Sequence, residues 1–130
     1  MRGRVVRLKL PLVSEEMKAW SAALATEATD WPRVSTRSFF GFTALYRKDK
    51  IFAMLPRTRA MGTPNTLAFK FEALTPRLYA QLEGDPRVGT TEMRAARWQT
   101  FDLHSDSDLR DALHWLARAY EAAGKSKKAH

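Results

Sequence analysis

Apolar residues recur with two different periods at the start of the chain, which predicts a strand followed by a helix. Residues 4–12 alternate between apolar and polar positions, as a half-buried strand does. The expected buried face of this strand carries Val6, Leu8, Leu10 and Leu12. Ser14 then offers an N-cap, and apolar residues at three- and four-residue spacing predict an amphipathic helix over 15–28. Pro32 ends this helix, because it pushes the preceding residue out of helical geometry.

The middle of the chain has the pattern of β-structure. Residues 36–46 are rich in aromatic and β-branched side chains, and residues 51–55 form a short apolar run. The polar segment 47–50 between them predicts the turn of a β-hairpin. Gly41 lies inside the first of these two strands and indicates a bulge or a close backbone approach. A third strand is expected at 66–72, where apolar and polar residues alternate again.

The last third of the chain predicts two helices with a strand between them. Thr75 and Pro76 form a strong helix start, and Gly84 ends this short helix. Residues 98–103 predict a fourth strand, which residues 90–94 either extend or pair with. The final helix has the clearest pattern, with capping oxygens expected from Ser105, Asp106 and Ser107. Its apolar face carries Leu109, Leu113, Leu116 and Tyr120.

These elements together predict an α+β fold. The connection at 47–50 is too short for a helical crossover, so the strands that it joins must be antiparallel. We therefore expect a single, mostly antiparallel sheet of about five strands, with two to three helices packed on one face.

Composition narrows the class of protein. The chain has 130 residues and no Cys, which fits one domain over 1–130 and excludes disulfides and Cys-based metal sites. No apolar run reaches the ~20 residues of a membrane span. The first apolar stretch, Val5–Val13, is interrupted by Arg7 and Lys9, so it does not fit a signal peptide. A cytoplasmic protein is the expectation.

Charge is the first pointer to a partner. The formal net charge is +8, and much of the excess lies in the two ends of the chain. Within the body, residues 33–59 hold seven basic residues and one acid, whereas residues 102–124 hold five acids and two basic residues. A basic segment folded onto one face would attract an anionic partner.

The basic residues of this segment fall at predicted loops. Arg47, Lys48 and Lys50 lie at the hairpin tip, and Arg57 and Arg59 lie in the next loop. Arginine suits bidentate contacts with phosphates, so these residues are candidates for binding nucleic acid. A solvated turn is the alternative, since charged runs at turns commonly face water.

Aromatic residues are concentrated on the predicted strands. They could stack on unpaired bases, or fill the core under the helices. Because each strand has one buried face, roughly half of them must belong to the core. An exposed part of the aromatic sheet would instead suit a protein partner. The residues concerned are Phe39, Phe40, Phe42, Tyr46, Phe52, Phe69, Phe71, Trp98 and Phe101.

No pattern supports a metal, a cofactor or a catalytic centre. Acidic and His residues alternate over 102–108, but helix capping accounts for most of that pattern. His114 has no nucleophile at a recognisable spacing, and no glycine-rich phosphate loop occurs. We therefore expect a protein that is not an enzyme, with a small-ligand site as the weakest hypothesis. The alternating residues are Asp102, His104, Asp106 and Asp108.

Three segments resemble one superfamily in order and spacing. FFGFTALYRKDKIFAML (39–55) resembles the hairpin of the TfoX N-terminal domain, and LAFKFE (67–72) resembles a strand shared with the MmcQ/YjbR-like proteins. RWQTFDL (97–103) and the helix after it are similar to the Trp-centred strand and closing helix of that superfamily. The resemblance spans about residues 36–123. The strand-like start of the chain and Phe42, where TfoX-type domains commonly have glycine, depart from it.

The resemblance implies an α+β sheet with helices on one side, in an arrangement proposed to bind DNA, and it implies no catalytic residue. It also adds Arg94 and Arg97, which precede the Trp-centred strand, to the candidate phosphate contacts. We therefore predict a nucleic-acid-binding or regulatory module with sequence-independent, salt-sensitive phosphate contacts. The alternative is a protein-interaction or adaptor module that uses an exposed aromatic sheet face.

Overall fold

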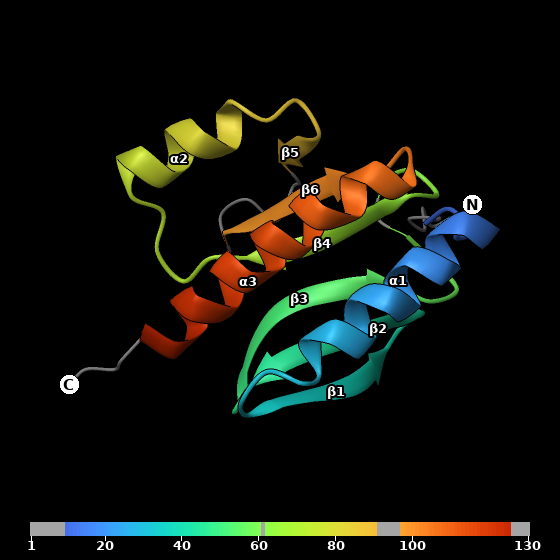
Figure 1. Ribbon diagram of the computed structural model, residues 1–130, viewed down its shortest axis with the longest axis horizontal. Coiled ribbons are helices and arrows are strands. Elements are labelled where there is room, and N and C mark those ends of the chain that lie inside the picture. Colours follow the sequence, from blue (N-terminus) through green and yellow to red (C-terminus); the bar gives the residue numbers. More distant parts are fainter. Residues whose placement is uncertain (1–9, 61, 91–96, 126–130) are drawn as a thin grey trace, which may run out of the picture.

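The computed structural model describes residues 10–60, 62–90 and 97–125. It contains one antiparallel six-stranded sheet, in the order β1-β2-β3-β4-β6-β5, and three α-helices (Figure 1). The strands are β1 Val34–Phe39, β2 Phe42–Arg47, β3 Lys50–Pro56, β4 Thr66–Lys70, β5 Val88–Thr90 and β6 Trp98–Asp102. The helices are α1 Glu15–Ala28, α2 Pro76–Glu83 and α3 Leu109–Lys125. The predicted α+β class is confirmed, with six strands instead of about five.

The main core lies between the sheet and the helices α1 and α3. Figure 1 shows α1 crossing the half of the sheet that contains β1 to β3, while α3 lies beside α1 and packs chiefly on β3 and β4. Alternate residues of β4 and the residue after it, Leu67, Phe69 and Phe71, are at most 1% exposed and face these helices. Each such side chain contributes roughly 1.5–3 kcal/mol through burial. The period of two in the sequence therefore identifies this face correctly.

The predicted helix starts are confirmed for α1 and α2. The Ser14 Oγ accepts a hydrogen bond from the backbone N–H of Met17 at 3.1 Å. The Thr75 Oγ1 accepts one from the backbone N–H of Leu78, also at 3.1 Å, with Pro76 in the first turn. These hydroxyls satisfy amide groups that have no partner inside the helix, and such caps typically stabilise a helix by about 1 kcal/mol.

The sheet is also buried over part of its opposite face. A second cluster lies there, with Leu10 and Ile51 packed against it. Its members are at most 7% exposed: Phe42, Ala44, Met54, Ala68 and Trp98. Phe42 and Trp98 therefore belong to a core rather than to an exposed surface, and the partly buried Tyr46 packs against the same cluster.

The predicted strand 36–46 is wrong in one respect, because it turns back on itself at Phe40 and Gly41. Phe39 pairs with Phe42 across a two-residue turn, which divides the segment into β1 and β2. Phe40 and Gly41 have φ values of 48° and 89°, both positive as in a type I′ turn. The sequence concealed this turn because phenylalanine favours strands and rarely occupies such a position.

The start of the chain and the segment before β6 are tested only in part. Most of the predicted strand 4–12 lies outside the described residues, and Leu12 is 65% exposed rather than on a buried face. Leu12 forms an isolated antiparallel bridge with Arg59. Val88–Thr90 pairs with β6, whereas most of 90–94 lies outside the described residues. Within the described ranges, no helix is long and apolar enough to cross a bilayer.

Candidate nucleic-acid interface

The predicted phosphate-binding residues divide between the two ends of strand β3. Arg47, Lys48 and Lys50 lie at its start, and Arg57 and Arg59 follow its end. The strand has seven residues, which corresponds to about 20 Å at the rise of an extended chain. The hairpin tip and the following loop therefore form two separate basic groups. Arg94 lies outside the described residues.

Arg47 packs back onto helix α3. Its guanidinium lies 4.2 Å from the centroid of the Tyr120 ring, and Nη1 donates a hydrogen bond to the Tyr120 carbonyl oxygen at 3.1 Å. The residue is half-buried. Arg47 thus joins the end of β2 to α3, which gives it a structural role in place of the free position expected at a hairpin tip.

Two of the other basic residues at this end have unusual backbone conformations. Lys48 and Arg97 are exposed and have φ values of 59° and 68°. The Lys48 N–H donates to the carbonyl oxygen of Arg33, which has a φ of 66°, at 2.9 Å. Lys50 is half-buried. Arg97 lies at the same end of the sheet, because its carbonyl oxygen accepts a hydrogen bond from the N–H of Phe71, the residue after β4, at 3.2 Å.

An exposed aromatic pair lies at the opposite end, on the turn between β1 and β2. Phe40 is 83% exposed and Phe39 is 41% exposed. Their rings meet edge to face, with centroids 4.8 Å apart. Two adjacent phenylalanine rings are seldom both exposed to water, because burial of large apolar side chains stabilises the folded state.

The loop after β3 is fastened directly to this turn. The Gly41 carbonyl oxygen accepts hydrogen bonds from three successive amides, those of Arg57, Thr58 and Arg59, at 3.0, 2.9 and 3.2 Å. Arg57 Nη2 lies 3.4 Å from the Ser38 Oγ, and Arg59 Nη1 donates to the Leu10 carbonyl oxygen at 3.0 Å. The segment that carries these two exposed arginines is therefore held beside the turn that carries the two rings.

We call this group the aromatic–arginine corner, defined as Phe39, Phe40, Arg57 and Arg59. Arg37 lies two residues before Phe39 on β1 and stacks on the Tyr46 ring at 5.0 Å. A pocket of about 310 Å³ opens beside Arg57, with Lys18 and Thr43 also in its lining. The corner combines stacking surfaces, cationic groups and adjacent open space.

Comparison of the chain with protein-family models, with curated proteins and with solved structures finds no match. The resemblance to the TfoX N-terminal domain and the MmcQ/YjbR-like proteins therefore stays a prediction.

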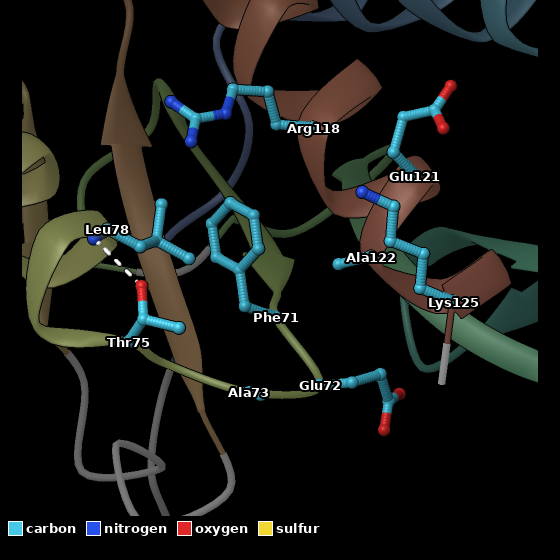
Figure 2. A pocket seen from close by; sticks show the side chains of 9 residues that line it. All are labelled: Phe71, Glu72, Ala73, Thr75, Leu78, Arg118, Glu121, Ala122 and Lys125. Atoms are coloured by element: carbon cyan, nitrogen blue, oxygen red, sulfur yellow. Dashed lines mark hydrogen bonds between the residues drawn. The ribbon is translucent and has the colours of Figure 1, made fainter. Parts of the chain in front are cut away.

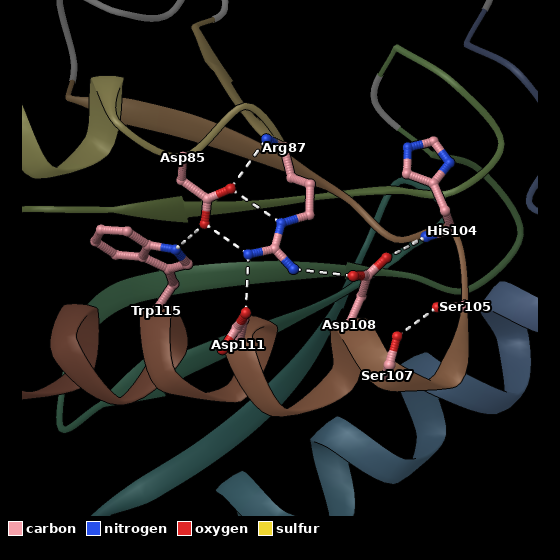
Figure 3. Close-up of polar contacts among 8 residues, drawn as sticks. All are labelled: Asp85, Arg87, His104, Ser105, Ser107, Asp108, Asp111 and Trp115. Atoms are coloured by element: carbon pink, nitrogen blue, oxygen red, sulfur yellow. Dashed lines mark hydrogen bonds and ion pairs between the residues drawn. The ribbon is translucent and has the colours of Figure 1, made fainter.

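The acidic residues near the C-terminus are engaged elsewhere, chiefly by Arg87 (Figure 3). Arg87 contacts Asp85, Asp108 and Asp111 at 2.8–2.9 Å and stacks over the Phe101 ring at 5.0 Å. The sequence analysis did not identify this arginine, because two of its partners lie 21 and 24 residues away and form no local sequence pattern with it. The network joins the loop before β5 to the start of α3.

Ionisation in this network follows from its hydrogen bonds. Burial alone would raise the pKa of Asp85, but bonds from Arg87 and from the Trp115 Nε1–H lower it below the ordinary 3.8. The backbone N–H of His104 and the Arg87 guanidinium likewise lower the pKa of Asp108. The Asp85 and Asp111 carboxylates raise the pKa of Arg87. The charged forms are therefore the stable forms in the folded protein.

The alternating residues 102–108 face different partners. Asp102 accepts a hydrogen bond from Thr66, Asp106 accepts one from the Trp20 Nε1–H at 2.7 Å, and Asp108 faces Arg87. Ser105 occupies the cap position without a side-chain cap bond, and the Ser107 Oγ contacts the Ser105 Oγ at 2.7 Å. The expected capping by Ser105, Asp106 and Ser107 is thus wrong, because Asp106 accepts from Trp20 and the two serine hydroxyls contact each other. The Asp108 carboxylate accepts from the His104 N–H, which lies before the helix. No group of three or more potential metal ligands occurs within the described ranges.

Proposed function

We propose that the protein binds single-stranded nucleic acid at the aromatic–arginine corner. Phe40 stacks on an unpaired base, and Arg57 and Arg59 contact the phosphates on either side of it. Such a combination of aromatic surface and positive charge is the usual basis of single-strand binding. The resemblance to a family proposed to bind DNA supports the same class of partner.

The exposure of Phe40 in a strained conformation carries this proposal. A non-glycine residue in the left-handed region costs roughly 1–2 kcal/mol, and asparagine or glycine is strongly preferred at this turn position. Phe40 is 83% exposed at a φ of 48°, so burial in the core does not offset that cost. Stacking of this ring on a base would contribute about 1–3 kcal/mol to binding, which gives the exposed ring a role.

Single strands fit the corner better than a duplex. The ring stands at the tip of a two-residue turn, where the face of an unpaired base can reach it. In a duplex, those faces are covered by stacking on neighbouring pairs. The proposed contacts go to phosphates and ring faces, so they read no sequence. On longer strands, Lys48, Lys50 and Arg97 add phosphate contacts at the other end of β3.

A protein partner is the competing hypothesis. Phe39 and Phe40 are the exposed rings of the sheet, Tyr46 is half-buried under Arg37, and Phe42 and Trp98 are at most 7% exposed. An adaptor function would therefore use the same corner. The two hypotheses differ in salt dependence, because neutralised phosphates release counterions and protein contacts with a neutral partner do not.

The test measures fluorescence anisotropy of labelled 15-nucleotide poly-dT and of a 15-base-pair duplex against the full chain over a salt series. Phe40→Asn removes the ring and suits the turn, so we expect the Kd for the single strand to rise about tenfold. Arg57→Gln and Arg59→Gln should each reduce the slope of log K against log salt by about 0.7. Arg77→Gln changes an exposed arginine on α2 and should leave both quantities unchanged.

Equal affinity for duplex and single strand, or an unchanged Kd for Phe40→Asn, would overturn the proposal. Absence of binding at 150 mM salt would also reject it and favour a protein partner at the corner.

A further inference from the structure

We infer that a pocket between the segment after β4, α2 and α3 binds a small carboxylate that carries an apolar body. The pocket has a volume of about 430 Å³ (Figure 2). Phe71 lines the pocket, and its backbone N–H donates to the carbonyl oxygen of Arg97, the residue before β6. The pocket thus lies at the end of the sheet opposite the aromatic–arginine corner. The site is therefore separate from the proposed nucleic-acid interface and does not depend on it.

The interior of the pocket is apolar. Phe71, Leu78 and Ala122 line it, and they come from the segment after β4, from α2 and from α3. In Figure 2 the Phe71 ring stands in the centre, with Leu78 on one side and Ala122 on the other. Pockets for small molecules commonly have volumes of 300–1,000 Å³ and apolar walls, so a phenyl or short alkyl group fits here.

The cationic groups at the rim are directed at this space. Arg118 and Lys125 lie seven residues apart on α3, hence on one face of the helix. Figure 2 shows the Arg118 guanidinium extending over the space between Phe71 and Leu78, and the Lys125 Nζ turned toward the same space. Stacking on the Trp115 ring at 5.3 Å holds Arg118 in place.

The acidic residues of the rim are oriented differently. Glu72 and Glu121 also line the pocket, but in Figure 2 both carboxylates point away from the Phe71 ring. Thr75, the N-cap residue of α2, also lines the pocket, and the N-terminus of a helix carries a partial positive charge. A carboxylate on the ligand would therefore be attracted by Arg118, Lys125 and the N-terminus of α2, whereas an ammonium group would be repelled by them.

The test is a ¹H–¹⁵N NMR titration of the full chain with three compounds that share one apolar body. These are 4-phenylbutyrate, 4-phenylbutylamine and 4-phenylbutanol. We expect 4-phenylbutyrate to shift amides in 71–78 and 118–125, with a Kd at least about fivefold lower than that of the alcohol or the amine. The expected ratio corresponds to one charge-assisted hydrogen bond in a partly exposed site.

Two variants examine the two parts of the pocket. Arg118→Gln should raise the Kd of 4-phenylbutyrate about fivefold and leave that of the alcohol unchanged. Ala122→Leu fills the apolar space and should abolish binding of both compounds. Arg110→Gln, an exposed change at the start of α3, is the matched control. The dispersion of each variant's spectrum verifies that it is folded.

The inference is overturned if the amine or the alcohol binds as tightly as the carboxylate, or if the shifted amides lie elsewhere. Unchanged binding in folded Ala122→Leu would also overturn it. Phe40→Asn should bind 4-phenylbutyrate like the unaltered chain, so this result is independent of nucleic-acid binding.

Discussion

Arg47 occupies the space in which a side chain at position 124 would lie. A Cβ atom built on Gly124 would overlap the Arg47 Cζ, since the two would be far closer than non-bonded carbon atoms can approach. The glycine in the last turns of α3 thus allows the guanidinium to stack on Tyr120. Strand β2 and helix α3 are joined at this point by an arginine that sequence analysis assigned to phosphate binding.

This relationship gives the first prediction. Gly→Ala in a helix usually stabilises by roughly 0.5–1 kcal/mol. We expect Gly124→Ala to be nearly neutral here, because the new methyl group displaces Arg47 from Tyr120 and loses a contact of about 0.5–1 kcal/mol. In an Arg47→Ala background the same change should show its full gain. Urea unfolding of the four proteins measures the coupling, and equal effects in both backgrounds would show that the two residues are independent.

Phe40 gives a prediction about stability that is independent of its ligand. Phe40→Asn should raise the free energy of unfolding by about 0.5–1 kcal/mol, because asparagine tolerates the left-handed conformation of this turn. Phe40→Leu keeps the strained backbone and removes the ring, so it should not stabilise. Thermal and urea unfolding measure both variants. A loss of stability in Phe40→Asn would mean that the ring contributes to packing.

Gly41, which lies next to the aromatic–arginine corner, is expected to tolerate replacement poorly. Its φ is 89°, and a Cβ there would lie 2.8 Å from the Arg59 Cγ and 2.9 Å from the Thr58 Oγ1. Gly41→Ala should destabilise by about 2 kcal/mol through strain and crowding. Gly62→Ala is the control, since Gly62 has a similar φ of 86° but its Cβ would meet its nearest atom at 3.7 Å. Similar losses in both variants would exclude the crowding component.

The Arg87 network predicts a pH dependence of stability. The pKa values of Asp85 and Asp108 are lower in the folded chain than the ordinary 3.8. Their contribution is therefore complete above about pH 4 and is lost as the pH falls through the lower folded values. Arg87→Met should cost about 2 kcal/mol at pH 7, a value reduced for the 26% exposure of its side chain. The cost should shrink below pH 4.

The pH dependence of that cost decides between ion pairing and packing. Urea unfolding of both proteins at pH 7 and pH 3 measures it, and Arg77→Met should stay within about 0.5 kcal/mol at both. If Arg87→Met costs the same at the two pH values, its stacking on Phe101 matters more than its charge.

Local patterns predicted most of the helices and strands. Helices α1 and α2 are capped by Ser14 and Thr75 as expected, because the side-chain oxygen of a cap acts on amides two or three residues away. The β2–β3 hairpin was also predicted, since a polar turn between two apolar strands is itself a local signal. In each case the residues that determine the structure are neighbours in sequence.

Relationships between distant segments were not predictable in this way. The turn at Phe40 depends on the loop at 57–59, whose amides bind the Gly41 carbonyl oxygen. The placement of Arg47 depends on a glycine 77 positions later in the chain. The sequence shows that Arg57 and Arg59 are charged, but it does not show that they lie at the same end of the sheet as the exposed rings of Phe39 and Phe40.

The three amides that converge on the Gly41 carbonyl oxygen also have a dynamic consequence. If either the β1–β2 turn or the loop after β3 opened alone, all three hydrogen bonds to this oxygen would break together. The two segments should therefore open as one cooperative unit. Rings and arginines then keep their spacing before any ligand arrives, and little ordering entropy is lost on binding. In hydrogen exchange, the amides of Arg57, Thr58 and Arg59 should therefore be protected to the same degree.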